Sequence, residues 1–479
     1  MKPNKNIYFL YIIVGAIILF CFCKTLLHYF NVLYYPAEVA DGEGLLSRNI
    51  LYLAQHKAIY QNINQWPFVF NVYPIFLPFL GSIFISLIKN PLLIGRIISV
   101  FSTFLIAILI YKYLRLQNTD KKIAIISSFA FLISPFVFIW GAWLRPDVLA
   151  ILFSFLSIYY FSKAKKFSIF LSGLFAILAF FTKPTMIAAA VAIFLYLLIT
   201  KKYRELIIWS AIVLFFGITI FYLINEQTHS QYFLHVIRYN ILSYNFRAFL
   251  SYSREFIILH WFFVFCFVYF LALSIREKKH LLLLLYGLVV VLLTLTSGRA
   301  GASINYYLEL VLVVILASGL LLNHFNANYQ RIIPFVLLLL ILQISWFSFY
   351  KQIIGQNIFN ESKEFSYSPS KQDFNTQIEI KNFVKQSCPG KIFSEDAVIA
   401  LSAQKEPVAI PATGLIALQK ANLWNQENFV NLVQQKEFSC IILIKGWIAE
   451  KSLQAIQDNY VLFDTKDTLW QYKIYKPRQ

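Results

Sequence analysis

Long apolar segments alternate with short polar segments over the first 350 residues of the chain. A helix that crosses a membrane needs about 20 consecutive apolar residues, and most of these segments approach that length. The pattern predicts about eleven spans and therefore a polytopic α-helical membrane protein. The predicted spans are residues 7–28, 92–111, 123–141, 148–161, 167–181, 184–199, 206–224, 256–275, 281–296, 306–322 and 332–349.

From residue 351 onward the pattern is that of a soluble α/β domain. Its periodicity predicts three helices and four strands. The helices are expected at 375–386, 429–437 and 448–458, and the strands at 391–396, 439–444, 460–464 and 471–475. We expect two domains, a membrane-embedded domain of residues 1–350 and a small domain of residues 351–479. The second shows no catalytic signature, and we expect it to act as a lid or a docking surface.

Composition agrees with a membrane protein, because 59% of the residues are hydrophobic and only 14% are charged. A net charge of +19 would suggest nucleic-acid binding in a soluble protein. Here the basic residues gather in short loops between apolar segments, as they do in cytoplasmic loops of membrane proteins. We therefore expect no nucleic-acid partner. Five cysteines are too few for a disulfide framework. The sequence leaves open whether Cys388 and Cys440 pair.

The basic loops also predict the topology. If residues 73–88 crossed the membrane, the basic loop at 112–122 and every later basic loop would lie outside the cell. We therefore expect residues 73–88, which contain Pro74 and Pro78, to form an interfacial or re-entrant helix. The N-terminus is then cytoplasmic, and the C-terminal domain is extracytoplasmic on a multi-pass protein of the plasma (inner) membrane.

A short acidic stretch follows the first span. Glu38, Asp41 and Glu43 lie within six residues of one another, and the glycines beside Glu43 allow a sharp turn or a close approach to a ligand. A solvated loop with helix-capping acids would explain this stretch alone. We expect Asp41 to be a catalytic base, with Glu43 as the alternative, in an outer catalytic loop of residues 31–91.

Other charged groups fall at the same expected surface. Arg145 and Asp147 flank a proline in a tight turn, and Lys183 and Arg299 lie in two further turns. Charges at the ends of spans are costly and often functional. The alternative for each is a local ion pair or contact with lipid headgroups.

Carboxylates and cations at one membrane surface fit glycosyl transfer from a lipid-linked sugar. A carboxylate accepts the proton of the acceptor hydroxyl, and cations stabilise the phosphate that leaves. One base and one phosphate clamp suffice for a single displacement with inversion. Two alternatives stay open, a lipid-linked glycan transporter or flippase and a polysaccharide polymerase of another fold. The aromatic and basic segment 227–254 keeps the polymerase alternative open.

Four motifs, in this order, resemble those of the GT-C superfamily, specifically bacterial glycosyltransferases of the protein O-mannosyltransferase and lipid A aminoarabinose transferase type. They are Glu38-Val-Ala-Asp-Gly-Glu43, Asn71-Val-Tyr-Pro74 leading to Gly95-Arg96, Arg145-Pro-Asp147 and Thr182-Lys-Pro-Thr185. Residues 303–309 are similar to a later segment of bacterial members. The resemblance covers roughly residues 1–350. It implies that Asp41 matches the catalytic aspartate, although Gly42 separates it from Glu43 where the family commonly has adjacent Asp and Glu.

The resemblance also implies the partners, which are a polyprenyl-phosphate-linked sugar donor, a lipid, glycan or protein acceptor, and the lipid bilayer. The substrate-binding residues expected are Tyr73, Arg145, Asp147, Lys183, Arg299, Asn305, Tyr306 and Glu309. We expect no cofactor. Glu38, Asp41, Glu43 and His56 offer ligands for a divalent metal, but their spacing fits no standard site.

Overall fold

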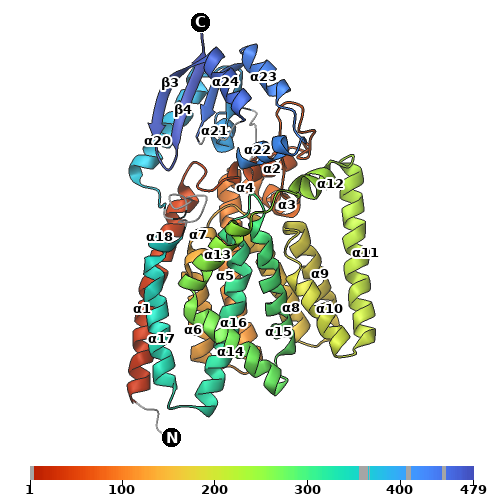
Figure 1. Ribbon diagram of the computed structural model, residues 1–479, viewed down its shortest axis with the longest axis vertical. Coiled ribbons are helices and arrows are strands. Elements are labelled where there is room, and N and C mark those ends of the chain that lie inside the picture. The colour runs from red at the N-terminus through yellow and green to blue at the C-terminus, as the bar shows by residue number, and fades with distance from the viewer. Residues whose placement is uncertain (1–4, 355–364, 366, 406–411, 445–448) are drawn as a thin grey trace.

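The computed structural model describes residues 5–354, 365, 367–405, 412–444 and 449–479. A bundle of helices carries a small α/β domain at one end, and the two termini lie at opposite ends of the molecule (Figure 1). The bundle is helical because a helix satisfies its backbone hydrogen bonds within one segment, as an apolar surrounding requires.

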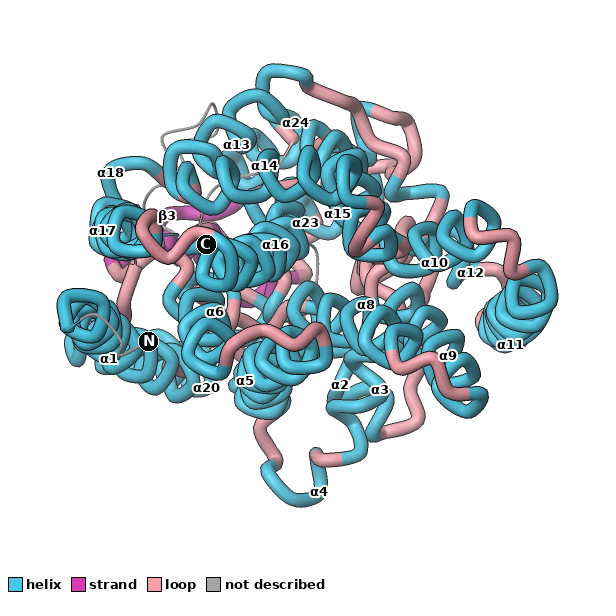
Figure 2. Tube along the Cα trace, turned by 90° about the horizontal axis from the view of Figure 1, so that it is seen from below, coloured by secondary structure: helices cyan, strands magenta, loops and turns pink. Residues whose placement is uncertain are grey.

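The helices of the first domain follow the apolar segments. They are α1 (Lys5–Tyr34), α2 (Glu43–Ala54), α3 (Phe76–Ile83), α4 (Ile85–Ile88), α5 (Pro91–Leu116), α6 (Lys121–Ile133), α7 (Pro135–Trp140), α8 (Pro146–Ser162), α9 (Lys166–Thr182), α10 (Ala188–Ile199), α11 (Tyr203–Gln227), α12 (Gln231–Val236), η1 (Arg238–Asn240), α13 (Phe246–Leu259), α14 (Trp261–Glu277), α15 (Leu281–Thr294), η2 (Leu295–Gly298), η3 (Ile304–Tyr307), α16 (Leu308–Asn328), α17 (Ile333–Trp346), η4 (Phe347–Phe349) and α18 (Tyr350–Ile353). Seen along the bundle, α16 lies in the interior and α11 at the edge (Figure 2).

The expected number of about eleven spans is not confirmed. Among the described residues, six helical segments are long and apolar enough to cross a membrane, or seven if α13 and α14 form one span. Part of the difference lies in α8, α9 and α10, which have 17, 17 and 12 residues and fall short of a full crossing. The expected span at 256–275 also contains a break, because α13 and α14 meet at an angle of 94°.

Residues 73–88 form no long helix. They fold into α3 and α4, of 8 and 4 residues, which together are only about 18 Å long and cannot cross a hydrocarbon layer about 30 Å thick. Both lie beside α2, at the end of the bundle that faces the C-terminal domain (Figure 1). The interfacial or re-entrant helix expected there is thus a pair of short helices, and its place at the membrane surface stays a prediction.

The C-terminal domain contains every strand that the sequence predicts. Its sheet has the order β1-β2-β4-β3, with β1 and β2 parallel and the other pairs antiparallel. Residue 448, the first of an expected helix, lies outside the described residues. The strands are β1 (Lys391–Ser394), β2 (Phe438–Leu443), β3 (Tyr460–Asp467) and β4 (Gln471–Pro477), and the helices are α20 (Lys371–Ser387), α21 (Ala397–Ser402), α22 (Ala412–Lys420), α23 (Glu427–Gln434) and α24 (Glu450–Asn459).

A disulfide joins Cys388 to Cys440 within this domain, with their Cα atoms 5.6 Å apart. The bond links the loop before β1 to the middle of β2 and so answers the question that the sequence left open.

The C-terminal domain shares its hydrophobic core with the loop between α2 and α3. Ile63, Phe68 and Phe70 of that loop are buried in one cluster with Phe393 and Phe438 of the sheet. Burial of large apolar side chains is worth about 1.5–3 kcal/mol each, so the domain is held firmly against the loop. It therefore rests directly on the segment that follows the acidic stretch.

Candidate active site

The acidic stretch forms a tight turn between α1 and α2. Gly42 has φ = 89°, in the left-handed region that glycine adopts without strain. A Cβ atom at this position would lie 2.9 Å from Nη1 of Arg145 and 3.2 Å from the hydroxyl of Tyr73. The left-handed backbone and the lack of space for a Cβ atom both favour glycine at this position. The turn, Tyr73 and Arg145 meet here.

Arg145 lies between this turn and two aromatic rings. Its Nη1 donates a hydrogen bond to the backbone carbonyl of Asp41. Its guanidinium carbon is 5.4 Å from the ring centroid of Tyr73 and 5.2 Å from that of Trp140, within the range of cation–π attraction. The side chain of Asp41 is partly exposed, unlike those of Glu38 and Glu43. Among the three acids, Asp41 is thus the one whose side chain is not fully buried.

A second group gathers around Asp147 at the start of α8. Its Oδ1 accepts from Nζ of Lys183 at 2.5 Å and from Nδ2 of Asn305 at 2.7 Å. All three residues are buried, so the carboxylate and the ammonium compensate each other's charge where water is largely excluded. Three elements that are distant in sequence, α8, the end of α9 and η3, are joined by this one oxygen.

Tyr306 connects Lys183 to Arg299. Nζ of Lys183 lies 4.3 Å from the centroid of the Tyr306 ring, and Nη2 of Arg299 donates to the Tyr306 hydroxyl at 2.7 Å. Nη1 of Arg299 donates to the carbonyl of Asn240 at 3.1 Å. Arg299 is therefore held in place by neutral oxygens rather than by a carboxylate.

The two groups lie within electrostatic reach of each other at Tyr73. Burial raises the pKa of Tyr73 to about 12, and the nearby Arg145 guanidinium opposes that rise. Asp41 from the turn, Asp147 from α8 and Tyr306 from η3 also act on this hydroxyl. Residues from the outer loop and from three later segments thus surround one site.

Glu43 has a different environment from the one expected of an alternative base. It is fully buried and forms an ion pair with Arg96, whose Nη2 lies 2.7 Å from Oε2. Its Oε1 also accepts from the amide of Leu144, and its Oε2 from the amide of Val39. Both oxygens are occupied by donors of the protein.

Glu309 lies beside the site rather than in it. Its Oε1 accepts from Ser154 Oγ at 2.5 Å and from the Tyr286 hydroxyl at 2.7 Å. The carboxyl group is buried in the bundle, with Lys183 as a charged neighbour.

Several buried donors close to Arg145 have no acceptor among the residues that the structure describes. They are Nε of Arg145 itself and the indole nitrogens of Trp140 and Trp143, whose rings are 4.8 Å apart. Nε of Arg299 also has no hydrogen-bond partner in the described part of the chain. Buried N–H groups usually find an acceptor, so these four are notable. Sequence reasoning missed both tryptophans as binding residues, although Trp143 and Trp140 lie only two and five residues before the Arg-Pro-Asp motif.

The acids of the first stretch do not form a metal site with His56, which is exposed. In the described part of the chain, no three His, Cys, Asp or Glu side chains gather closely enough to hold a metal ion.

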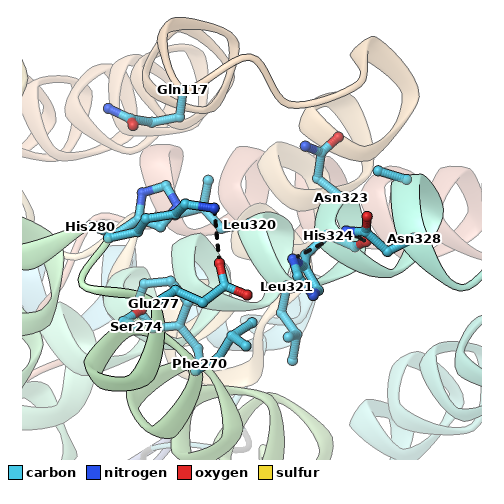
Figure 3. A pocket seen from close by; sticks show the side chains of 13 residues that line it. Gln117, Phe270, Ser274, Glu277, His280, Leu320, Leu321, Asn323, His324 and Asn328 are labelled. Carbon is cyan, nitrogen blue, oxygen red and sulfur yellow. Dashed lines mark hydrogen bonds and ion pairs between the residues drawn. The ribbon is translucent and has the colours of Figure 1, made fainter.

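A cavity of about 210 Å³ lies at the opposite end of the bundle, where α14 meets α15 and α16 ends (Figure 3). Its polar lining includes Glu277, Lys279, His280 and His324, with Lys279 paired to Glu277 at 3.0 Å. No expected site residue lines it, so it is separate from the site described above.

Comparison with known proteins confirms the resemblance that the motifs predict. Residues 72–227 match the family model described as dolichyl-phosphate-mannose-protein mannosyltransferase. This range includes Tyr73, Arg145, Asp147 and Lys183 but not the acidic stretch. No curated protein sequence matches the chain.

Two solved proteins share the fold over most of the chain. ArnT from Cupriavidus metallidurans, bound to undecaprenyl phosphate, has a TM-score of 0.64 at 10% identity, over 95% of this chain and 97% of that one. The apo state of the same protein gives a TM-score of 0.61 at 10% identity, over the same shares. The oligosaccharyltransferase of Archaeoglobus fulgidus has a TM-score of 0.54 at 12% identity, over 98% of this chain and 75% of that one.

Proposed function

We propose that this chain, which has a GT-C fold, is an integral membrane glycosyltransferase. It transfers a sugar from a polyprenyl-phosphate donor to a hydroxyl group of a lipid, glycan or protein acceptor, with inversion. The observation that carries the proposal is that Asp41, Tyr73 and Arg145 meet Asp147 and Lys183 around one site. Arg299 joins this site through the hydroxyl of Tyr306. A base and a set of cations are what this displacement requires.

Asp41 is the base in this mechanism. A hydroxyl group is a poor nucleophile at neutral pH, so a carboxylate must accept its proton as the new bond forms. Asp41 is partly exposed, and its backbone is fixed by Arg145. Glu43 is fully buried and bonded to Arg96, and we assign it a positioning role instead.

Arg145 and the two neighbouring tryptophans bind the phosphate of the donor. Nε of Arg145 and the indole nitrogens of Trp140 and Trp143 are all donors, and a phosphate offers only acceptors. The charge of Arg145 is not balanced by an ion pair among the described residues, whereas that of Lys183 is balanced by Asp147. Lys183 therefore contributes by holding Asp147 and Tyr306, and Arg145 carries the charge that faces the leaving group.

The reaction takes place on the outer face of the membrane. The C-terminal domain rests on the same end of the bundle as the acidic turn (Figure 1). That domain contains the Cys388–Cys440 disulfide, and disulfides persist mainly in oxidising compartments. The helices α8, α10 and α14 end away from the C-terminal domain, and a basic loop follows each of them. This placement agrees with a cytoplasmic location for the three loops.

The test is release of the lipid carrier from labelled donors. Membranes from cells that produce the protein are incubated with a panel of labelled polyprenyl-phosphate sugars, and labelled product and free polyprenyl phosphate are separated. We expect at least one donor to turn over with wild-type protein and not with Asp41→Asn. Equal turnover of every donor in membranes with and without the protein would overturn the proposal.

A further inference from the structure

Glu38, the first acid of the acidic stretch, contacts the C-terminal domain. Its Oε1 accepts a hydrogen bond from the backbone amide of Ala397 at 3.0 Å, where α21 begins. A side chain at Gly44 would collide with that same oxygen and with Ala397, whose Cβ would be 2.7 Å from an added Cβ. The packing of α2 against α21 thus depends on a glycine and leaves Glu38 almost completely buried.

Asp396 brings a second carboxyl group to this contact. Its Oδ1 caps α21 by accepting from the amide of Val398 at 2.9 Å, and its Oδ2 accepts from the hydroxyl of Tyr472 at 2.9 Å. Asp396 directly precedes Ala397, whose amide donates to Glu38, so the two carboxyl groups are neighbours in this contact. Two ionised carboxylates only accept hydrogen bonds and repel each other, so a hydrogen bond between them requires a proton on one of the two groups.

The surroundings of Glu38 and Asp396 favour the protonated form of a carboxyl group. The other acids that face Glu38 are Asp41 and Glu43 of its own stretch, and Glu43 is already neutralised by Arg96. Among the described residues neither Glu38 nor Asp396 forms an ion pair with a cation. Burial raises the pKa of both carboxyl groups, and the neighbouring carboxylates raise the pKa of Glu38 further.

We propose that Glu38 and Asp396 share one proton, and that this shared proton holds the C-terminal domain on the acidic turn and so positions Asp41. The catalytic part of this inference rests on the proposed function, whereas the contact itself does not. Asp41 lies three residues after Glu38, and the turn between them is short. A shift of Glu38 is therefore transmitted directly to the base.

The contact has a defined dependence on pH. Because the pKa values are raised in the docked state, the docked state binds a proton more tightly than the open state does. The stabilisation is complete at low pH, below the ordinary carboxyl pKa, and is lost as pH rises through the raised value. Above it, two buried negative charges repel each other, and the C-terminal domain loosens from the turn.

Hydrogen exchange of the full-length protein in lipid nanodiscs tests the contact without any need for turnover. After correction for intrinsic exchange, opening at the amide of Ala397 in wild-type protein should increase by up to roughly tenfold per pH unit between the ordinary carboxyl pKa and the raised pKa, and should level off above the raised pKa. Glu38→Gln retains an acceptor for that amide and gains a permanent donor toward Asp396, so its opening should be independent of pH. Glu437→Gln, at an exposed ion pair with Lys391, is the matched control and should behave as wild type.

Two results would overturn the inference. One is the same pH dependence of opening in Glu38→Gln as in wild type, and the other is no pH dependence in either protein. The role in positioning Asp41 is tested by the pH profile of kcat, which should lose its alkaline fall in Glu38→Gln while the KM for donor stays the same. If no donor turns over at all but exchange behaves as expected, the proposed function fails and the contact stands.

Discussion

Glu43 and Arg96 form an ion pair with no solvent exposure, and this pair connects both sides of the site. Glu43 is two residues from Asp41, and its Oε1 accepts from the amide of Leu144, the neighbour of Arg145. One carboxylate therefore fixes the positions of the base and of the phosphate-binding arginine. The guanidinium of Arg96 also donates to the carbonyl groups of Val32, Tyr35 and Ala37.

We predict that Glu43→Gln destabilises the protein. It leaves the charge of Arg96 buried without a counter-ion, and removing one partner of such a pair typically costs about 3–5 kcal/mol. Thermal unfolding of purified protein in detergent should show a clearly lower midpoint than wild type. Glu437→Gln, which removes an exposed ion pair with Lys391, should change stability by less than about 1 kcal/mol. A stable Glu43→Gln protein that binds donor but has no turnover would instead identify Glu43 as the base.

Asp41→Asn should lower turnover without lowering stability, in contrast to Glu43→Gln. It keeps the shape of the turn and the backbone bond to Arg145, because that bond uses the carbonyl of residue 41. We expect an unchanged unfolding midpoint, unchanged donor affinity, and a kcat lower by about 10²–10⁴, as for loss of a general base. Asp458→Asn, an exposed substitution on α24, serves as the control for expression and handling. Near-normal kcat in Asp41→Asn would contradict the assignment.

Donor binding should depend more on Arg145 than on Lys183. Arg145→Gln removes charge-assisted hydrogen bonds worth about 1.5–3 kcal/mol, which corresponds to a Kd for polyprenyl phosphate raised roughly 10- to 100-fold. Lys183→Gln leaves Asp147 buried without its cation, so we expect it to lower the unfolding midpoint as well. Binding titrations of Arg145→Gln, Lys183→Gln and Arg299→Gln rank the three residues by their contribution to donor affinity. Unchanged affinity in Arg145→Gln would rule out this phosphate clamp.

Much of the architecture follows from sequence patterns because the patterns are local. Apolar segments become helices, and the four strands of the last domain appear where β-rich runs stand. The motifs also indicate which segments meet, since Arg145 lies over the ring of Tyr73 and Lys183 pairs with Asp147. The number of spans is less well predicted, because α8, α9 and α10 are apolar but shorter than a bilayer crossing.

The roles of individual acids did not follow from the sequence. Glu38, Asp41 and Glu43 look equivalent as a cluster, yet each has a different partner. Glu43 pairs with Arg96, which is 53 positions away, and Glu38 contacts Ala397, which is 359 positions away. Only the three-dimensional structure shows that such residues are in contact. It also shows that Asp41 is partly exposed, whereas Glu38 and Glu43 are buried.

The last prediction concerns the orientation of the chain. Lys89 directly follows α4 and Lys121 begins α6, and α5 with its 26 residues lies between them. A helix of that length measures about 39 Å, enough to cross the hydrocarbon layer. Single cysteines at these two exposed positions should therefore react with a membrane-impermeant thiol reagent from opposite sides, Lys89→Cys from outside and Lys121→Cys from the cytoplasm.

The background for this experiment is a protein in which Cys21, Cys23 and Cys266 are replaced and the disulfide is kept. A reagent applied to intact cells should label Lys89→Cys, and Lys121→Cys should react only after the cells are opened. Labelling of both from the same side would mean that α5 does not cross the membrane. Labelling of Lys121→Cys alone from outside would invert the chain, and the acidic turn with its base would then face the cytoplasm, where a donor presented at the outer surface cannot reach it.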